Sequence, residues 1–107
     1  TAEQESISTM VFDEVDSGIG GAVSTAVGER LKKLGKNRQV LVVTHSPQVA
    51  SLGVHHFLVK KKLVNNITSI DVIKIDGHDK TNEIARMLSG KQITNEAVEA
   101  ARKLIES

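Results

Sequence analysis

Two short apolar runs, each closed by polar residues, most constrain how this chain folds. Residues 9–12 read Thr-Met-Val-Phe and lead into Asp13 and Glu14, and residues 40–43 read Val-Leu-Val-Val and lead into a turn that contains His45. Unbroken apolar runs of this length are typical of strands buried on both faces, as in parallel sheets. The chain is therefore expected to contain two such strands, each ending in residues that can carry chemistry.

The segment between these runs has the pattern of an amphipathic helix. Residues 22–34 carry apolar side chains at helical spacing, and Gly35 stands where a helix C-terminal cap is expected. Strand, helix and strand together predict a βαβ unit with parallel strands and a right-handed crossover. The apolar positions of the helix are Val23, Ala26, Val27, Leu31 and Leu34.

The second half of the chain predicts a hairpin and helices. Pro47 can open a short helix, and residues 57–64 and 67–75 flank Asn65-Asn66, a pair that tolerates the positive φ angles of tight hairpin turns. Two C-terminal helices should follow, capped by Thr81 and Thr94. Their apolar residues are Ile84, Met87, Leu88, Ala97, Ala101, Leu104 and Ile105. The fold class is thus α/β, and no repeat or linker divides residues 1–107.

Composition excludes several classes of protein. Hydrophobic residues at 39% and charged residues at 25% are ordinary for a globular protein, and no apolar run is long enough to cross a bilayer, so no membrane partner is expected. The absence of cysteine favours a reducing cytoplasm. A net charge of +1 and only two aromatic residues, both Phe, do not indicate a dedicated nucleic-acid reader.

The polar residues at the two strand ends form a candidate site. Ligands of open α/β sheets bind outside the carboxyl ends of the strands, where Asp13, Glu14 and His45 should emerge. If the strand pleat persists, the two carboxylates point to opposite sides, so one can hold a cation while the other orients or deprotonates water. An imidazole there can donate a hydrogen bond to a phosphate oxygen. Acidic strand ends also cap helices and histidines also occupy turns, so each residue alone leaves both interpretations open.

Three segments carry a resemblance to a known family. Thr-Met-Val-Phe-Asp-Glu at 9–14 looks like a Walker B motif, Val-Asp-Ser-Gly-Ile-Gly-Gly at 15–21 looks like a D-loop, and Val-Thr-His-Ser-Pro-Gln-Val-Ala at 43–50 looks like an H-loop. The chain thereby resembles the C-terminal part of an ABC-type, SMC-like ATPase head, a P-loop NTPase, and within that class the RecN family of bacterial DNA repair proteins. Residues 55–61 and 83–90 extend the resemblance.

The resemblance implies roles for particular residues. Asp13 would hold the Mg²⁺ of MgATP through water, and Glu14 would polarise the attacking water. Asp16 would contribute to the contact between two heads, and His45 would touch the γ-phosphate. It also implies a parent protein that binds ATP and Mg²⁺ between the heads of a homodimer, hydrolyses ATP, and acts on DNA in double-strand break repair and recombination, in the bacterial cytoplasm at the nucleoid.

The departures from the family pattern predict a partial domain. No Gly-x-x-x-x-Gly-Lys-Ser/Thr motif occurs, and no Leu-Ser-Gly-Gly signature precedes residue 9. Leu-Ser-Gly-Lys at 88–91 fits a glycine helix cap better than either motif. We therefore expect residues 1–107 to be inactive alone and to need the rest of their own ATPase head. An ABC transporter ATPase fragment and a non-catalytic interaction module remain as alternatives.

Three further features bear on partners. In the family the P-loop strand lies beside the H-loop strand, so the edge of residues 40–43 should lack a neighbour, which predicts a dimer, a rearranged sheet or low stability. Members of the family carry an acidic residue where Val54 stands, so this chain departs from the pattern there. His55 and His56 are adjacent, and adjacent strand residues face opposite ways, so the two histidines do not easily share one metal ion. Residues 60–62 are Lys-Lys-Lys, either a solvated strand edge or a contact for an anion or DNA.

Overall fold

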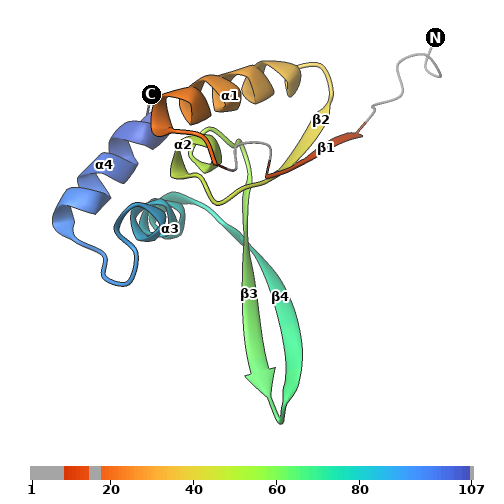
Figure 1. The fold of residues 1–107 in the computed structure, drawn as a ribbon, viewed down its shortest axis with the longest axis vertical. Coiled ribbons are helices and arrows are strands. Elements are labelled where there is room, and N and C mark those ends of the chain that lie inside the picture. The colour runs from red at the N-terminus through yellow and green to blue at the C-terminus, as the bar shows by residue number, and fades with distance from the viewer. Residues whose placement is uncertain (1–8, 15–17, 107) are drawn as a thin grey trace.

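The computed structural model describes residues 9–14 and 18–106, and they form four strands and four helices in an α/β order (Figure 1). The predicted βαβ unit, hairpin and two C-terminal helices all occur. Among the described residues, no helix is both long and apolar enough to cross a membrane. The elements are β1 (Thr9–Asp13), α1 (Gly21–Leu34), β2 (Gln39–Val43), α2 (Pro47–Ala50), β3 (His56–Val64), β4 (Ile67–Ile75), α3 (Gly77–Ser89) and α4 (Asn95–Glu106).

Strands β1 and β2 pair in parallel, as predicted, with α1 as the crossover between them. The register runs from Thr9 opposite Gln39 to Asp13 opposite Val43. The expected burial on both faces is wrong, because Val11 and Leu41 are 62% and 51% exposed. Burial alternates along both strands, so one face is half-buried and the other is uncovered in the part of the chain that the structure describes. The sheet there also has two strands only. The second edge of β2 therefore has no strand neighbour there, as expected from the missing P-loop strand, and the consequences for association and stability remain a prediction.

The buried face of α1 combines two small residues with Leu31, one of its predicted apolar residues. Ser24 and Gly28 are buried with Leu31, whereas Val23 and Ala26 are exposed. A Cβ added at Gly28 would lie 2.8 Å from Leu52 Cδ1 and 3.3 Å from the Cα of Val49. The two backbones thus approach more closely than a larger residue would allow, which explains why Ser24 and Gly28, which apolar periodicity did not include, belong to the buried face.

Strands β3 and β4 form an antiparallel hairpin that extends away from the helices (Figure 1). The turn is Asn65-Asn66, whose φ angles of 52° and 63° confirm the prediction from their side chains. Strand β3 begins at His56, one residue earlier than predicted. The arm is solvent-exposed from residue 59 to residue 74, and Ile75 is buried where the hairpin joins α3.

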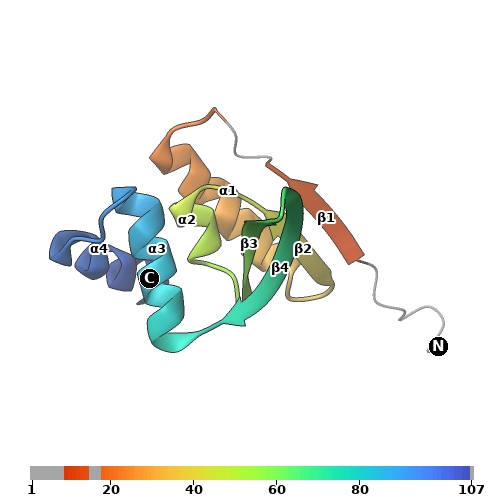
Figure 2. The ribbon, with the colours of Figure 1, turned by 90° about the horizontal axis from the view of Figure 1, so that it is seen from below.

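The most deeply buried cluster lies between α3 and α4, which are neighbours in both views and cross each other (Figures 1 and 2). Thr94 caps α4 as predicted, because its Oγ1 accepts a hydrogen bond from the Ala97 N–H at 3.1 Å. The predicted cap at Thr81 is wrong, because α3 already begins at Gly77, which has a φ of 52° and turns the chain sharply after β4. The buried core residues are Ile84, Ala85, Ala97 and Ala101.

The glycine after α3 ends the helix as the sequence predicts. Gly90 is the C-cap, with a φ of 81°, and its N–H donates to the Arg86 carbonyl at 2.8 Å. A positive φ favours glycine because it has no Cβ. The segment 88–91 is thus a helix end, so its likeness to a nucleotide-binding motif is only superficial.

Candidate functional site

The carboxyl ends of β1 and β2 bring together the side chains that the sequence places there. Glu14 follows β1, and its backbone N–H donates to the carbonyl of Val43, the last residue of β2, at 2.8 Å. His45 follows β2, and its Nε2 lies 3.0 Å from Oε1 of Glu14. With a proton on Nε2, the imidazole donates a hydrogen bond to the carboxylate. The two residues predicted to act on a phosphate and on water thus meet at one point.

Glu14 leaves the strand in an uncommon backbone conformation. Its φ is 53°, a left-handed value that non-glycine residues adopt rarely and at a cost of about 1 kcal/mol or more. The pleat therefore ends at Asp13, so the expectation that the Asp13 and Glu14 side chains alternate across a continued strand does not apply. Residues held in such conformations concentrate at functional sites, and here the hydrogen bond to Val43 holds the turn.

The turn that carries His45 is held on both sides by short-range hydrogen bonds. The Ser46 N–H donates to Thr44 Oγ1 at 2.9 Å, and the Val49 N–H donates to Ser46 Oγ at 3.3 Å, which caps α2. Ser46 Oγ in turn donates to Gln48 Oε1 at 3.1 Å. These contacts order the backbone around the imidazole, while the imidazole itself projects into solvent.

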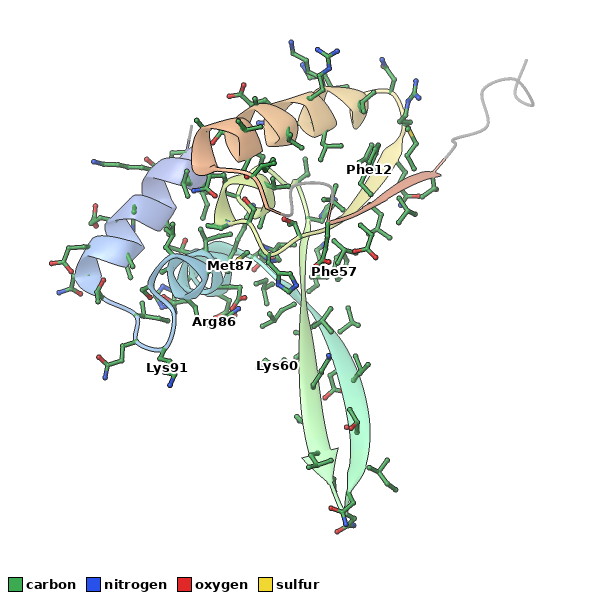
Figure 3. All side chains as sticks on the ribbon, viewed as in Figure 1. Phe12, Phe57, Lys60, Arg86, Met87 and Lys91 are labelled. Carbon is green, nitrogen blue, oxygen red and sulfur yellow. The ribbon has the colours of Figure 1, made fainter. Side chains whose placement is uncertain are left out.

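The Glu14 and His45 side chains border an open cavity of about 450 Å³. Sequence reasoning missed part of its lining. Gln48 lies within the H-loop-like segment, so that resemblance could have indicated its place in the cavity wall. The apolar spacing of Met87 of α3 (Figure 3) predicts only a helix face. The lining residues are Glu14, Gly18, Ile19, Gly21, Ser24, His45, Ser46, Pro47, Gln48, Met87 and Leu88.

Solvent reaches the charged groups of this site. The His45 side chain is 89% exposed and that of Glu14 is 48% exposed, and an ion pair so exposed contributes little to stability. Its geometry therefore bears more on binding and chemistry than on folding. Asp13 is also exposed at the end of β1. A single exposed carboxylate suits Mg²⁺, which keeps most of its water ligands, better than a metal that needs a full protein cage.

Two further predictions concern Asp16 and the histidine pair His55-His56. Asp16 lies outside the described residues. His55 is exposed while its neighbour His56 is half-buried, and the Nδ1 of His56 is buried without a hydrogen-bond partner in the part of the chain that the structure describes. Burial first, and then the positive charge of Lys80, lower the pKa of His56, and the Glu83 carboxylate opposes that shift. The two histidines thus occupy different surroundings.

Comparison with known proteins identifies relatives for nearly the whole chain. No family model matches it. It is 48% identical over 102 residues to the DNA repair protein RecN of Xylella fastidiosa (strain 9a5c), covering 95% of this chain and 18% of the relative. It is 41% identical to RecN of Vibrio cholerae over 98% of this chain and 19% of the relative. It is 47% identical to RecN of Deinococcus radiodurans over 91% of this chain and 17% of the relative. The chain thus spans less than a fifth of the length of these proteins.

A solved structure has a similar fold. It comes from work on ATP-driven dimerization and DNA-stimulated activation of SMC ATPases, and it superposes with a TM-score of 0.56 at 17% sequence identity. The match covers 78% of this chain and 49% of the other. At this identity the similarity establishes the fold.

Proposed function

This chain belongs to the RecN family as a C-terminal segment of it, and from that premise we propose that it supplies one half of a composite MgATP site in a DNA repair ATPase. The observation that carries the proposal is the 3.0 Å contact between Glu14 and His45 at the ends of adjacent parallel strands. A candidate general base and a candidate phosphate ligand meet there beside an open cavity, where a nucleotide phosphate and a water could both enter.

Each residue has a distinct role in this proposal. Glu14 orients the attacking water and accepts a proton from it. Its carboxylate is free to do so once the His45 imidazole donates to another acceptor. His45 donates from Nε2 to an oxygen of the γ-phosphate. Asp13 holds water ligands of Mg²⁺ at the end of β1. MgATP, when bound, supplies the phosphoryl group that is transferred to water, a reaction that depends mainly on positioning and charge stabilisation.

The proposed site needs contributions from outside residues 1–107. The sequence contains no Walker A motif, whose backbone amides and lysine normally supply much of the phosphate affinity, so this segment alone should bind ATP weakly. We place the remainder of the site in the rest of the same head and in a second head, contacted through Asp16. The SMC ATPase neighbour is named for dimerization driven by ATP, which supports this arrangement.

The proposed partner of the whole protein is DNA. The relatives are bacterial proteins named for DNA repair, and the structural neighbour is named for activation by DNA. These names support a parent protein that acts in DNA repair. We propose further that it couples ATP hydrolysis to repair and recombination in the bacterial cytoplasm at the nucleoid.

The test uses the full-length protein that carries this segment. Glu14→Gln keeps the size of the side chain and removes its charge, so MgATP binding should persist while turnover falls by about 10²-fold to 10⁴-fold. Glu99→Gln on α4 is the matched control, because it removes an exposed carboxylate that pairs with Arg102 at 2.6 Å. Undiminished turnover in Glu14→Gln would remove Glu14 from the mechanism. A wild-type protein that binds MgATP without hydrolysing it would favour the non-catalytic interaction module.

A further inference from the structure

The end of α1 and the turn into β2 concentrate positive charge. Residues 29–38 contain one carboxylate, that of Glu29, and five cationic side chains, all of them exposed. None of the five forms an ion pair with a carboxylate in the part of the chain that the structure describes. The positive charge of this segment is therefore available to a ligand. The five residues are Arg30, Lys32, Lys33, Lys36 and Arg38.

Three of these cations border one concave surface. Lys32, Lys33 and Lys36, which we call the α1 lysine cluster, line a cavity of about 340 Å³. Polar side chains of both flanking helices, Thr25 of α1 and Gln48 of α2, line the same cavity. The rest of its wall is formed by Glu29, Ser51, Leu52 and Leu104. Because three lysines face a single carboxylate, the net charge of the groove favours an anion.

A fourth cation, on another element, is close enough to one lysine of the cluster to affect its own protonation. Lys80 of α3 donates from Nζ to the Gly53 carbonyl at 2.8 Å. Its pKa is lowered first by burial and then by the positive charge of Lys32. Positive side chains from α1 and α3 thus repel one another here, and a bound anion would relieve that repulsion.

Helix stability explains only part of this pattern. Lysines in the last turn interact favourably with the helix dipole, which accounts for Lys32 and Lys33. The effect falls off within that turn, whereas Lys36 and Arg38 lie beyond Leu34, the last residue of α1. Lys36 therefore gains little from the helix, so its place in the cluster needs another reason.

We propose that the α1 lysine cluster binds the phosphodiester backbone of DNA. The choice of DNA over an acidic protein rests on the proposed function of a DNA repair ATPase. Binding should be independent of sequence, because the chain's two aromatic side chains, Phe12 and Phe57, belong to β1 and β3 (Figure 3) and no ring lies within the cluster to stack on bases. A modest net charge of +1 is compatible with this, because the cations gather on one surface.

The test measures how strongly salt weakens DNA binding. Full-length protein and its Lys32→Gln/Lys33→Gln/Lys36→Gln variant are titrated into a labelled DNA duplex between about 50 and 200 mM salt, and affinity is read by fluorescence anisotropy. Three lost phosphate contacts should reduce the steepness of log K against log salt by about 2.7. The ratio of the affinity at 50 mM salt to the affinity at 200 mM salt should therefore be about 40-fold smaller in the variant than in the wild type. The Arg variant of the same three lysines should keep the wild-type slope.

A second triple variant controls for total charge. Lys60→Gln/Lys61→Gln/Lys62→Gln removes the same charge from the hairpin and should leave the slope unchanged. An unchanged slope in the α1 variant, or an equal loss in the hairpin variant, would overturn the proposal. Competition by polyglutamate as strong as that by DNA of equal charge would also overturn it, since the surface would then accept any polyanion.

Measuring MgATP binding in the same samples separates this inference from the proposed function. The α1 lysines lie outside the Glu14 and His45 site, so their variant should bind MgATP like the wild type. If the wild type failed to bind MgATP while the salt slope still depended on the α1 lysines, the ATPase proposal would fall and the DNA contact would stand.

Discussion

The close contact between α1 and α2 makes Gly28 a sensitive test of the packing. Gly28 is buried within a helix, and a Cβ there would lie 2.8 Å from the Leu52 side chain and 3.3 Å from the Val49 backbone. Replacing this glycine by alanine therefore sets two effects against each other. Alanine favours the helix, and the added methyl group crowds α2.

The magnitudes decide the sign of the effect. Alanine in place of glycine in a helix interior stabilises by about 1 kcal/mol. The Leu52 methyl group can rotate away, but the Val49 Cα belongs to the backbone, and overpacking of this kind costs about 1 to 3 kcal/mol. We expect Gly28→Ala to lower the free energy of unfolding by about 1 kcal/mol, from the difference of these terms.

Urea unfolding followed by far-UV circular dichroism measures this difference. Ala26→Gly is the matched control, because Ala26 is an exposed residue of the same helix and its replacement should cost about 1 kcal/mol of helix propensity alone. If Gly28→Ala stabilised the protein by as much as Ala26→Gly destabilises it, the added methyl group would meet no obstacle. The close α1–α2 contact would then be refuted.

Two further predictions concern pH and the open edge of the sheet. The pKa of His56 is lower in the fold than its ordinary value of 6.5, so the unfolded chain binds more protons below that pH and the free energy of unfolding should fall on acidification from pH 6.5. Urea midpoints measured at several pH values should fall less in His56→Gln than in the wild type. An identical fall in both proteins would assign the pH dependence to other groups. The second edge of β2 should leave amides within residues 40–43 unprotected from exchange and should promote association of the chain. Hydrogen exchange measures the protection of these amides, and sedimentation at several concentrations measures the association. A monomer with all of these amides strongly protected would contradict the prediction.

Local pattern was enough to predict most elements of this fold. The apolar runs, the Asn65-Asn66 turn and the glycine after α3 all act over a few residues, so the sequence predicts them directly. The convergence of Glu14 and His45 also follows from sequence, because parallel strands joined by one crossover helix end at the same edge of a sheet.

Helix boundaries and buried faces were less predictable. Thr81 has the chemistry of an N-cap, yet the sharp turn at Gly77 starts α3 before it. Val23 and Ala26 have the spacing of a buried face, yet the near approach of α2 buries Ser24 and Gly28 instead. In both cases the deciding contact comes from a neighbouring segment, which periodicity along one helix does not contain.

The sequence by itself determined the α/β order, the motif-bearing strand ends and the family resemblance, because each depends on residue type and short spacing. The tertiary structure alone decided the left-handed φ of Glu14, the 3.0 Å contact with His45, the entry of Met87 into the cavity wall, and the hydrogen bond from Lys80 of α3 to the Gly53 carbonyl. These features join segments far apart in the chain, and their distances depend on how side chains of both partners fill the space between backbones.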